Sequence, residues 1–129
     1  MGLVAAGTWM ITALAGVYLF WRWLSGGGLR RQASKVTPFP LTLVFSHPAL
    51  AVSALACWVG YLLTGQRALA WTAFGVLAAA ALLGFAMFTR WLGGGRHARS
   101  GGFPVLAVAL HGVAGVTTFV LVLLVASVF

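Results

Sequence analysis

Two histidines stand at the same step of two similar phrases. "FPLTLVFSH" ends at His47 and "FPVLAVALH" ends at His111, so each histidine follows a Phe-Pro pair and six mostly apolar residues. Imidazole ligates metals, forms hydrogen bonds and changes its charge near neutral pH. Two imidazoles at matching positions of an apolar chain therefore mark a candidate site for a metal or a metal-bearing cofactor.

The composition places this site in a lipid environment. The chain has 129 residues, of which 62% are hydrophobic and 6% charged, and it contains no Asp or Glu. A soluble domain carries roughly 25% charged residues. Most of this chain must therefore face lipid.

Four apolar stretches are long enough to cross a bilayer, which takes about 20 helical residues. They are Leu3–Leu24, Phe39–Thr64, Ala68–Leu92 and Pro104–Phe129. Lipid leaves no partner for the backbone groups of an open sheet edge, so helices are expected. The sequence predicts an all-α membrane four-helix bundle that forms one domain over residues 1–129.

Basic residues predict the orientation of the bundle. Most of them lie in or beside the first and third connections: Arg22, Arg30, Arg31, Lys35, Arg90, Arg96 and Arg99. Short loops rich in Lys and Arg stay cytoplasmic. We expect a multi-pass protein of the inner (plasma) membrane with both termini outside. Membrane topology accounts for the net charge of +8, so no nucleic-acid partner is expected.

The similarity between the two halves extends beyond the histidine phrases. "RWLSGGG" after the first apolar stretch matches "RWLGGG" after the third, and the same alignment pairs Gly16 with Gly84. This pattern predicts two tandem helical hairpins, over about residues 1–64 and 68–129, related by an axis along the membrane normal. The alternative is convergence, because Arg-Trp and Phe-Pro are both common at helix ends.

The spacing puts the histidines and the glycines at one depth. Each histidine lies seven residues after its proline, roughly 10 Å into the helix, and each glycine lies roughly 12 Å before the end of its own helix. The diagonal of a four-helix square is roughly 12–14 Å for neighbouring axes 8–10 Å apart. That width suits a haem iron between the imidazoles of His47 and His111, with Gly16 and Gly84 clearing space for the macrocycle.

Other residues of this layer would complete a haem site. Small residues follow each histidine by one turn on the same face, at Ala51 and Gly115. Arg22 and Arg90 are available at the near face for the anionic propionates. The predicted cofactor is haem b.

A hydrogen bond to the second imidazole nitrogen would orient each ligand. Pro48 removes a backbone bond to the carbonyl of Val44. We expect that carbonyl, or the carbonyl of Leu43, to accept the proton of the His47 ring.

This arrangement resembles the haem-binding four-helix core of the cytochrome b family. Histidines stand on the second and fourth helices and glycines on the first and third, at Gly16 and Gly84. The resemblance implies bis-histidine ligation and electron transfer. That family core holds two haems, with two histidines on each ligand helix, whereas each ligand helix has one here. The resemblance therefore implies a single site near the cytoplasmic face.

A second resemblance implies no activity. "FPVLAVALHGVAGVTTFVLVLL" and "LLGFAMFTRWL" are similar to segments of small four-helix membrane proteins of actinobacteria.

Tryptophans are expected mainly at the membrane interfaces, because indole rings favour the headgroup level. Five of them fall near helix ends, at Trp9, Trp21, Trp23, Trp71 and Trp91, whereas Trp58 lies deeper.

Three functions stay open at this point. The first is a b-type haem protein that acts as an electron-transfer subunit of a membrane oxidoreductase, with a quinone or a protein as redox partner. The second is a non-catalytic accessory subunit of a larger complex or of a homo-oligomer. The third is a small transporter or channel with a histidine-lined path. A zinc site would need more ligands, and a proton-coupled exporter relies on an intramembrane carboxylate, which this chain lacks.

Overall fold

The protein is an all-α four-helix bundle. The computed structural model describes residues 1–29, 39–97 and 103–128, and shows no strand among them. The helices are α1 (Gly2–Ser25), α2 (Leu41–Thr64), α3 (Arg67–His97) and α4 (Val105–Val128).

Local chemistry explains most of the helix ends. Pro40 is the N-cap of α2 with extended angles (φ −63°, ψ 149°), and α4 begins directly after Pro104. Proline suits this place because it has no N–H that would need an acceptor. Gly65 ends α2 at φ 72°, and its N–H donates to the carbonyl of Tyr61 (2.7 Å). The left-handed region is open to glycine at little cost, so the chain turns sharply into α3.

One predicted boundary is wrong. We expected the third helix to end at Leu92, but α3 continues to His97 through three glycines. Glycine costs only about 1 kcal/mol per residue in a helix. The first proline after this stretch is Pro104, so no residue before it forbids a further helical turn.

All four helices are long and apolar enough to cross a membrane. Their outer faces carry large apolar side chains, such as Leu3 (80% exposed), Leu63 (81%) and Leu106 (81%). Lipid can cover such a surface and water would not. The chain is a multi-pass membrane protein.

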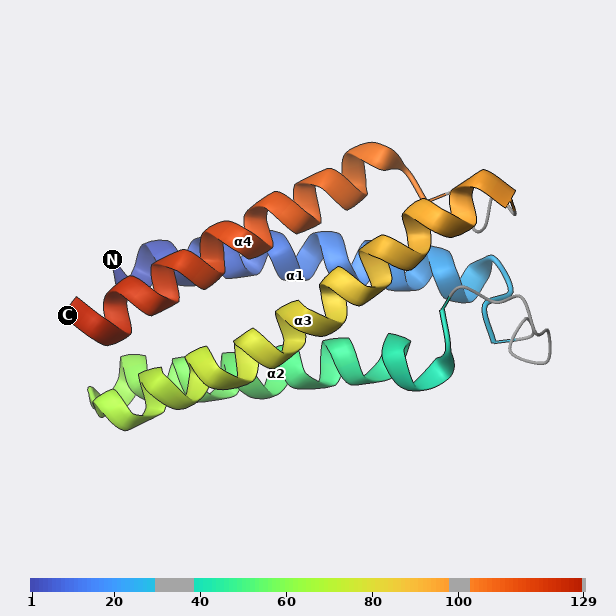
Figure 1. Ribbon diagram of the computed structural model, residues 1–129. Coiled ribbons are helices and arrows are strands. Elements are labelled where there is room, and N and C mark those ends of the chain that lie inside the picture. The colour runs from blue at the N-terminus through green and yellow to red at the C-terminus, as the bar shows by residue number, and fades with distance from the viewer. Residues whose placement is uncertain (30–38, 98–102, 129) are drawn as a thin grey trace.

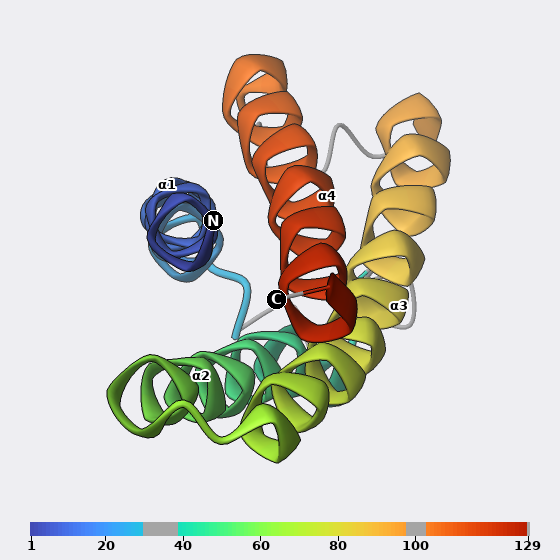
Figure 2. The same cartoon turned by 90° about the vertical axis from the view of Figure 1, so that its left-hand side faces the viewer.

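The helices do not pack in the pairs that the sequence repeat suggests. α2 packs along α3 and α1 along α4, whereas α1 and α2 touch only slightly. Figures 1 and 2 show these two pairs, with α4 also leaning on α3. Each main interface therefore joins one helix of the first predicted hairpin to one helix of the second.

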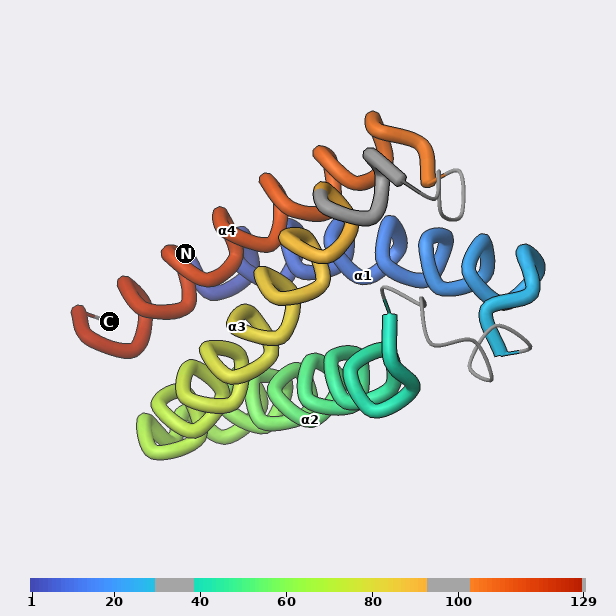
Figure 3. The backbone as a smooth tube through the Cα atoms, turned by 45° about the vertical axis from the view of Figure 1, so that its right-hand side comes forward, coloured from blue at the N-terminus to red at the C-terminus, as the bar shows by residue number. Residues whose placement is uncertain are grey.

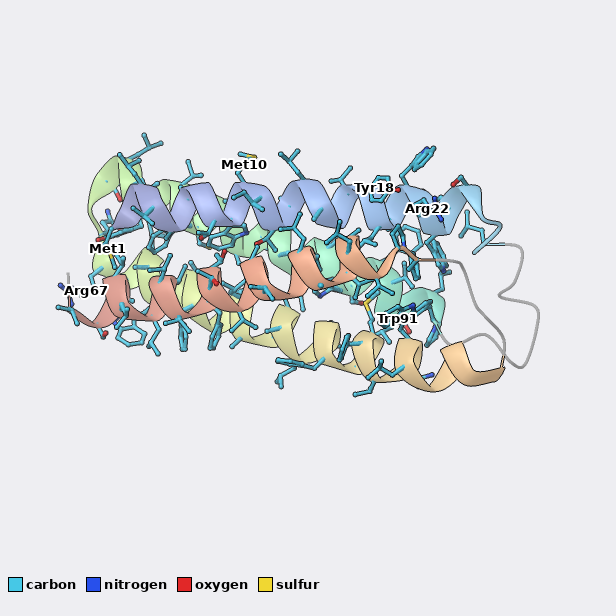
Figure 4. The ribbon with its side chains drawn as sticks, turned by 90° about the horizontal axis from the view of Figure 1, so that it is seen from above. Met1, Met10, Tyr18, Arg22, Arg67 and Trp91 are labelled. Atoms are coloured by element: carbon cyan, nitrogen blue, oxygen red, sulfur yellow. The ribbon has the colours of Figure 1, made fainter. Side chains whose placement is uncertain are left out.

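The bundle has two distinct ends. Both termini lie at one end, and α1 ends and α2 begins at the other (Figure 3). Figure 4 places Met1 and Arg67 at the terminal end, and Arg22 and Trp91 at the opposite end, which we call the loop end.

Each half of the bundle has its own buried cluster. The cluster in the terminal half contains Ala5, Trp9, Ala54, Trp58, Ala70, Ala73, Val122, Val125 and Ala126. The cluster at the loop end contains Trp23, Phe39 and Val44, with Phe20, Met87, Trp91 and Phe103 packed against it. The histidines belong to neither cluster and lie in the layer between them.

Two tryptophans differ from the expected interfacial positions. Trp9 is 3% exposed and Trp23 is 7% exposed, so both are buried. Trp9 packs beside Trp58, with ring centroids 6.3 Å apart. The ring of Trp23 lies so close to Gly28 that a side chain there would overlap it. Both rings therefore pack against protein partners inside the bundle.

Candidate functional site

The two histidines face each other across the centre of the bundle. The ring centroids of His47 and His111 are 6.0 Å apart, and the ring planes meet at 80°. Phe39 and Phe103, the first residues of the two repeated phrases, also contact each other, with centroids 5.6 Å apart. In each of these two pairs, a residue of the first phrase contacts the residue at the matching position of the second phrase. This is the arrangement expected around a pseudo-two-fold axis.

Each imidazole is held by a backbone carbonyl of a neighbouring helix. Nδ1 of His47 donates to the carbonyl of Ala80 on α3, and Nδ1 of His111 donates to the carbonyl of Thr12 on α1, both at 2.8 Å. A carbonyl oxygen can only accept, so Nδ1 carries the proton in both rings. In the neutral rings, Nε2 therefore keeps its lone pair, which is the form that binds a metal.

The expected acceptor for His47 is wrong. We predicted the carbonyl of Val44 or Leu43, in the same helix, whereas the acceptor is Ala80. α2 packs closely along α3, which brings an α3 carbonyl into reach of the ring. The bond therefore fixes the imidazole relative to a second helix as well as to its own.

The glycines lie directly against the imidazoles. A Cβ atom on Gly16 would stand 2.9 Å from Cε1 of His111, and one on Gly84 would stand 3.0 Å from Cε1 of His47. Real Cβ atoms essentially never show a contact under 3.0 Å, so a side chain on Gly16 would displace the His111 ring, and one on Gly84 would require the His47 ring to give by a few tenths of an ångström. The absence of a side chain lets each ring lie flat enough on the neighbouring helix to reach its carbonyl, which belongs to the residue one turn earlier. The two glycines therefore make room for the imidazole rings themselves.

The other predicted site residues lie farther from the rings. Gly115 faces α1, where an added Cβ would touch Cγ2 of Thr12 at 3.5 Å. Ala51 is half-buried one turn after His47 on α2. Arg22 and Arg90 lie six residues beyond the two glycines, so roughly 9 Å closer to the loop end, where Arg22 is half-buried and Arg90 exposed.

A cluster of three hydroxyls beside His111 did not emerge from the sequence. Thr118 Oγ1 lies 2.9 Å from Thr8 Oγ1 and 3.4 Å from Thr12 Oγ1, and the Thr118 side chain is 1% exposed. Each hydroxyl also reaches a carbonyl of its own helix. The sequence indicates this cluster only by two spacings. Thr8 and Thr12 lie four residues apart on α1, and Thr118 follows His111 by seven residues on α4.

This hydroxyl cluster breaks the symmetry of the site. The alignment that pairs the two glycines puts Val76 and Ala80 opposite Thr8 and Thr12, and the alignment of the histidines puts Ala54 opposite Thr118. The surroundings of His111 are therefore more polar than those of His47.

The terminal half of the bundle is filled by side chains. Trp58 and Val122, at matching positions of the repeat, are both 0% exposed. The indole Nε1–H of Trp58 is buried with no hydrogen-bond partner. Among the described residues, imidazole nitrogens therefore come together inside the bundle only in the histidine layer.

The described residues bring two imidazole nitrogens together in this layer. Among residues 1–29, 39–97 and 103–128 there is no group of three or more His, Cys, Asp or Glu side chains that could hold a metal ion. Cys57 is a half-buried free thiol packed against the cluster of the terminal half. A group held here would therefore have to bring its remaining ligands with it.

Comparisons with family models, with curated proteins and with solved structures gave no match.

Proposed function

We propose that this chain is a membrane-embedded b-type haem protein, with His47 and His111 as the axial ligands of a single haem near the loop end. In this proposal the loop end faces the cytoplasm, and the chain serves as an electron-transfer or haem-binding subunit.

The separation of the two rings is the observation that carries the proposal. Metal–imidazole bonds are roughly 2 Å long, and a ring nitrogen lies about 1 Å from the ring centre. Two imidazoles on one metal therefore have centroids roughly 6 Å apart. The rings of His47 and His111 are 6.0 Å apart, and their protons are on Nδ1.

The surrounding chain holds the ligands in this arrangement. The carbonyls of Ala80 and Thr12 fix the tautomer and the plane of each ring, as outer hydrogen bonds commonly do for ligating histidines. A haem held by His47 and His111 would supply one-electron oxidation and reduction, at a potential that these ligands and their surroundings help to set. Buried clusters lie on both sides of the layer, one at the loop end and one in the terminal half.

The absorption spectrum of the intact protein tests the proposal. Protein purified in detergent from haem-replete cells is expected to show a Soret band, and a pyridine haemochrome assay is expected to give about one haem b per chain. Chemical reduction should sharpen the visible bands of a six-coordinate iron. A well-folded, colourless protein would overturn the proposal.

Alanine at either glycine is expected to weaken haem binding. In Gly16→Ala or Gly84→Ala the added methyl group would meet the imidazole at about 3 Å, so the ring must turn away from its carbonyl. Loss of such outer hydrogen bonds typically costs about 10–100-fold in metal affinity. Haem titration of the apoprotein measures the change.

Gly7 and Gly75 provide matched controls for this prediction. They lie on the same two helices, and an added Cβ on either would meet nothing within 4 Å. Gly7→Ala and Gly75→Ala should keep the affinity of the unchanged protein. Equal affinities in all four variants would show that the glycines do not position the ligands.

The alternatives receive less support. A histidine-lined path would have to continue through the terminal half, where Trp58, Val122 and Thr118 are almost fully buried. An accessory role fits the same geometry and is separated by redox titration. A haem that quinol cannot reduce, in otherwise intact protein, would favour the accessory role.

A further inference from the structure

The hydroxyl cluster of Thr8, Thr12 and Thr118 joins α1 to α4 by hydrogen bonds. The hydroxyls of Thr8 and Thr12 donate to carbonyls of their own helix, at 3.0 and 2.8 Å. A hydroxyl has one proton and two lone pairs, so both oxygens act as acceptors toward α4. Thr118 Oγ1 lies 2.9 Å from Thr8 Oγ1 and shares its proton between this oxygen and the carbonyl of Ala114 (2.8 Å).

Burial makes this contact a specific link between the two helices. The Thr118 side chain is 1% exposed, so neither water nor lipid headgroups can replace its partners. Lipid provides no hydrophobic force between membrane helices, which therefore depend on packing and on polar contacts of this kind. The cluster is thus expected to help fix how α1 lies against α4.

Thr12 contacts α4 at two places. Its carbonyl accepts from Nδ1 of His111 (2.8 Å), and its hydroxyl lies 3.4 Å from the hydroxyl of Thr118. His111 and Thr118 are seven residues apart, roughly 10 Å along α4. Two contacts at this separation restrict both the sliding and the rotation of α1 against α4. The cluster therefore controls where the carbonyl that accepts from His111 stands.

The other imidazole has no such cluster. Nδ1 of His47 donates to the carbonyl of Ala80 on α3. The positions that match the three threonines are Val76, Ala80 and Ala54, none of which carries a hydroxyl. Ala80 and Ala54 are buried, so apolar packing of α2 along α3 positions this carbonyl. Loss of the Thr118 hydroxyl should therefore affect one imidazole and spare the other.

We propose that the hydroxyl cluster positions His111 as a haem ligand through the carbonyl of Thr12, an inference that rests on the proposed haem function. Thr118 is then a positioning residue, because it acts on the imidazole only through Thr12. The cluster keeps the acceptor within reach of Nδ1, which leaves Nε2 without a proton and free to bind iron. The two axial ligands are thus held by different means, His111 by a hydroxyl network and His47 by packing.

Carbon monoxide binding to the reduced protein tests this role in Thr118→Val. Valine keeps the shape of threonine and leaves no donor without an acceptor, since Thr8 and Thr12 still donate to their own helix. Carbon monoxide binds a six-coordinate haem only after one imidazole has left. Loss of a hydrogen bond between membrane helices changes an equilibrium roughly 3- to 20-fold, so the carbon monoxide affinity should rise by this factor. Thr118→Ser keeps the hydroxyl and should restore the original affinity.

A second readout needs no haem. In the apoprotein with ¹⁵N-labelled histidine, nuclear magnetic resonance gives the rate at which each Nδ1 proton exchanges with water. Exchange at His111 should rise roughly 3- to 20-fold in Thr118→Val and stay unchanged at His47. General destabilisation of the bundle would instead raise both rates. Thr8→Val removes the acceptor on α1 and should also raise exchange at His111 alone.

Thr117→Val is the matched control. This neighbouring residue is exposed, and its hydroxyl donates to the carbonyl of Val113 in its own helix (2.8 Å). The variant should leave the carbon monoxide affinity and both exchange rates unchanged. Equal increases at His47 and His111, or no increase at His111 in Thr118→Val and Thr8→Val, would overturn the positioning role.

The two readouts separate this inference from the proposed function. Faster exchange at His111 alone, in a protein that shows no Soret band, overturns the haem proposal and leaves the cluster as the group that positions the imidazole. A Soret band together with unchanged exchange at His111 in both variants overturns the positioning role alone.

Discussion

His47→Ala and His111→Ala are each expected to abolish the Soret band of the purified protein. Each imidazole supplies one of the two ring nitrogens that meet in this layer of the described residues. Loss of an outer hydrogen bond to a ligand already costs about 10–100-fold in metal affinity, so loss of the ligand itself should exceed about 100-fold. Haem content per chain, measured by pyridine haemochrome, gives the result.

His97→Ala is the control for these two variants. His97 ends α3, six residues before Phe103, and belongs to neither repeated phrase, so its loss should leave the haem content unchanged. The glycine variants His47→Gly and His111→Gly add a second readout, because free imidazole would enter the vacated space and restore a six-coordinate spectrum. Retention of full haem content in either alanine variant would exclude that histidine as a ligand.

Trp58→Ala is expected to cause the largest loss of stability. The side chain is 0% exposed and contacts Trp9 and Tyr61, with ring centroids 6.3 and 5.1 Å away. Membrane helices associate largely through such packing. Truncation of a buried aromatic ring to alanine typically costs about 3–5 kcal/mol, because the structure closes the cavity only in part. Thermal unfolding in detergent, followed by circular dichroism, measures the change.

Two further variants show whether packing is the cause. Trp58→Phe keeps most of the ring and removes the Nε1–H, which has no acceptor. An unsatisfied buried donor costs about 1–3 kcal/mol, so this variant should be far closer to the unchanged protein than Trp58→Ala. Trp21→Ala, at a site 58% exposed, should change the stability little. Equal losses for Trp58→Ala and Trp21→Ala would contradict a packing role.

Much of the architecture follows from the sequence because lipid imposes simple demands. The lengths of the four apolar stretches predicted four membrane-spanning helices, and the two Phe-Pro pairs predicted where α2 and α4 begin. The spacing from those prolines put His47 and His111 at one depth, since helical rise is constant. The same reasoning could not find the end of α3, because glycine disfavours a helix without preventing it.

The interior of the site depended on contacts that no local pattern records. The carbonyl that accepts from His47 belongs to Ala80 on another helix, and the sequence offered nearer carbonyls with equal chemistry. The burial of Trp9 against Trp58, and the meeting of Thr118 with Thr8, likewise join residues remote in the chain. Their positions depend on the crossing of helices, which side-chain packing decides.

The sequence by itself determined that the chain is a membrane bundle of four helices and that it carries two histidines at matching depth, because length, polarity and helical rise are local properties. Only the tertiary structure decided that the main interfaces are α2 with α3 and α1 with α4. It also decided which carbonyls hold the imidazoles and that the two rings lie 6.0 Å apart. These outcomes depend on how the surfaces of four helices fit together, and each helix carries only one part of that fit.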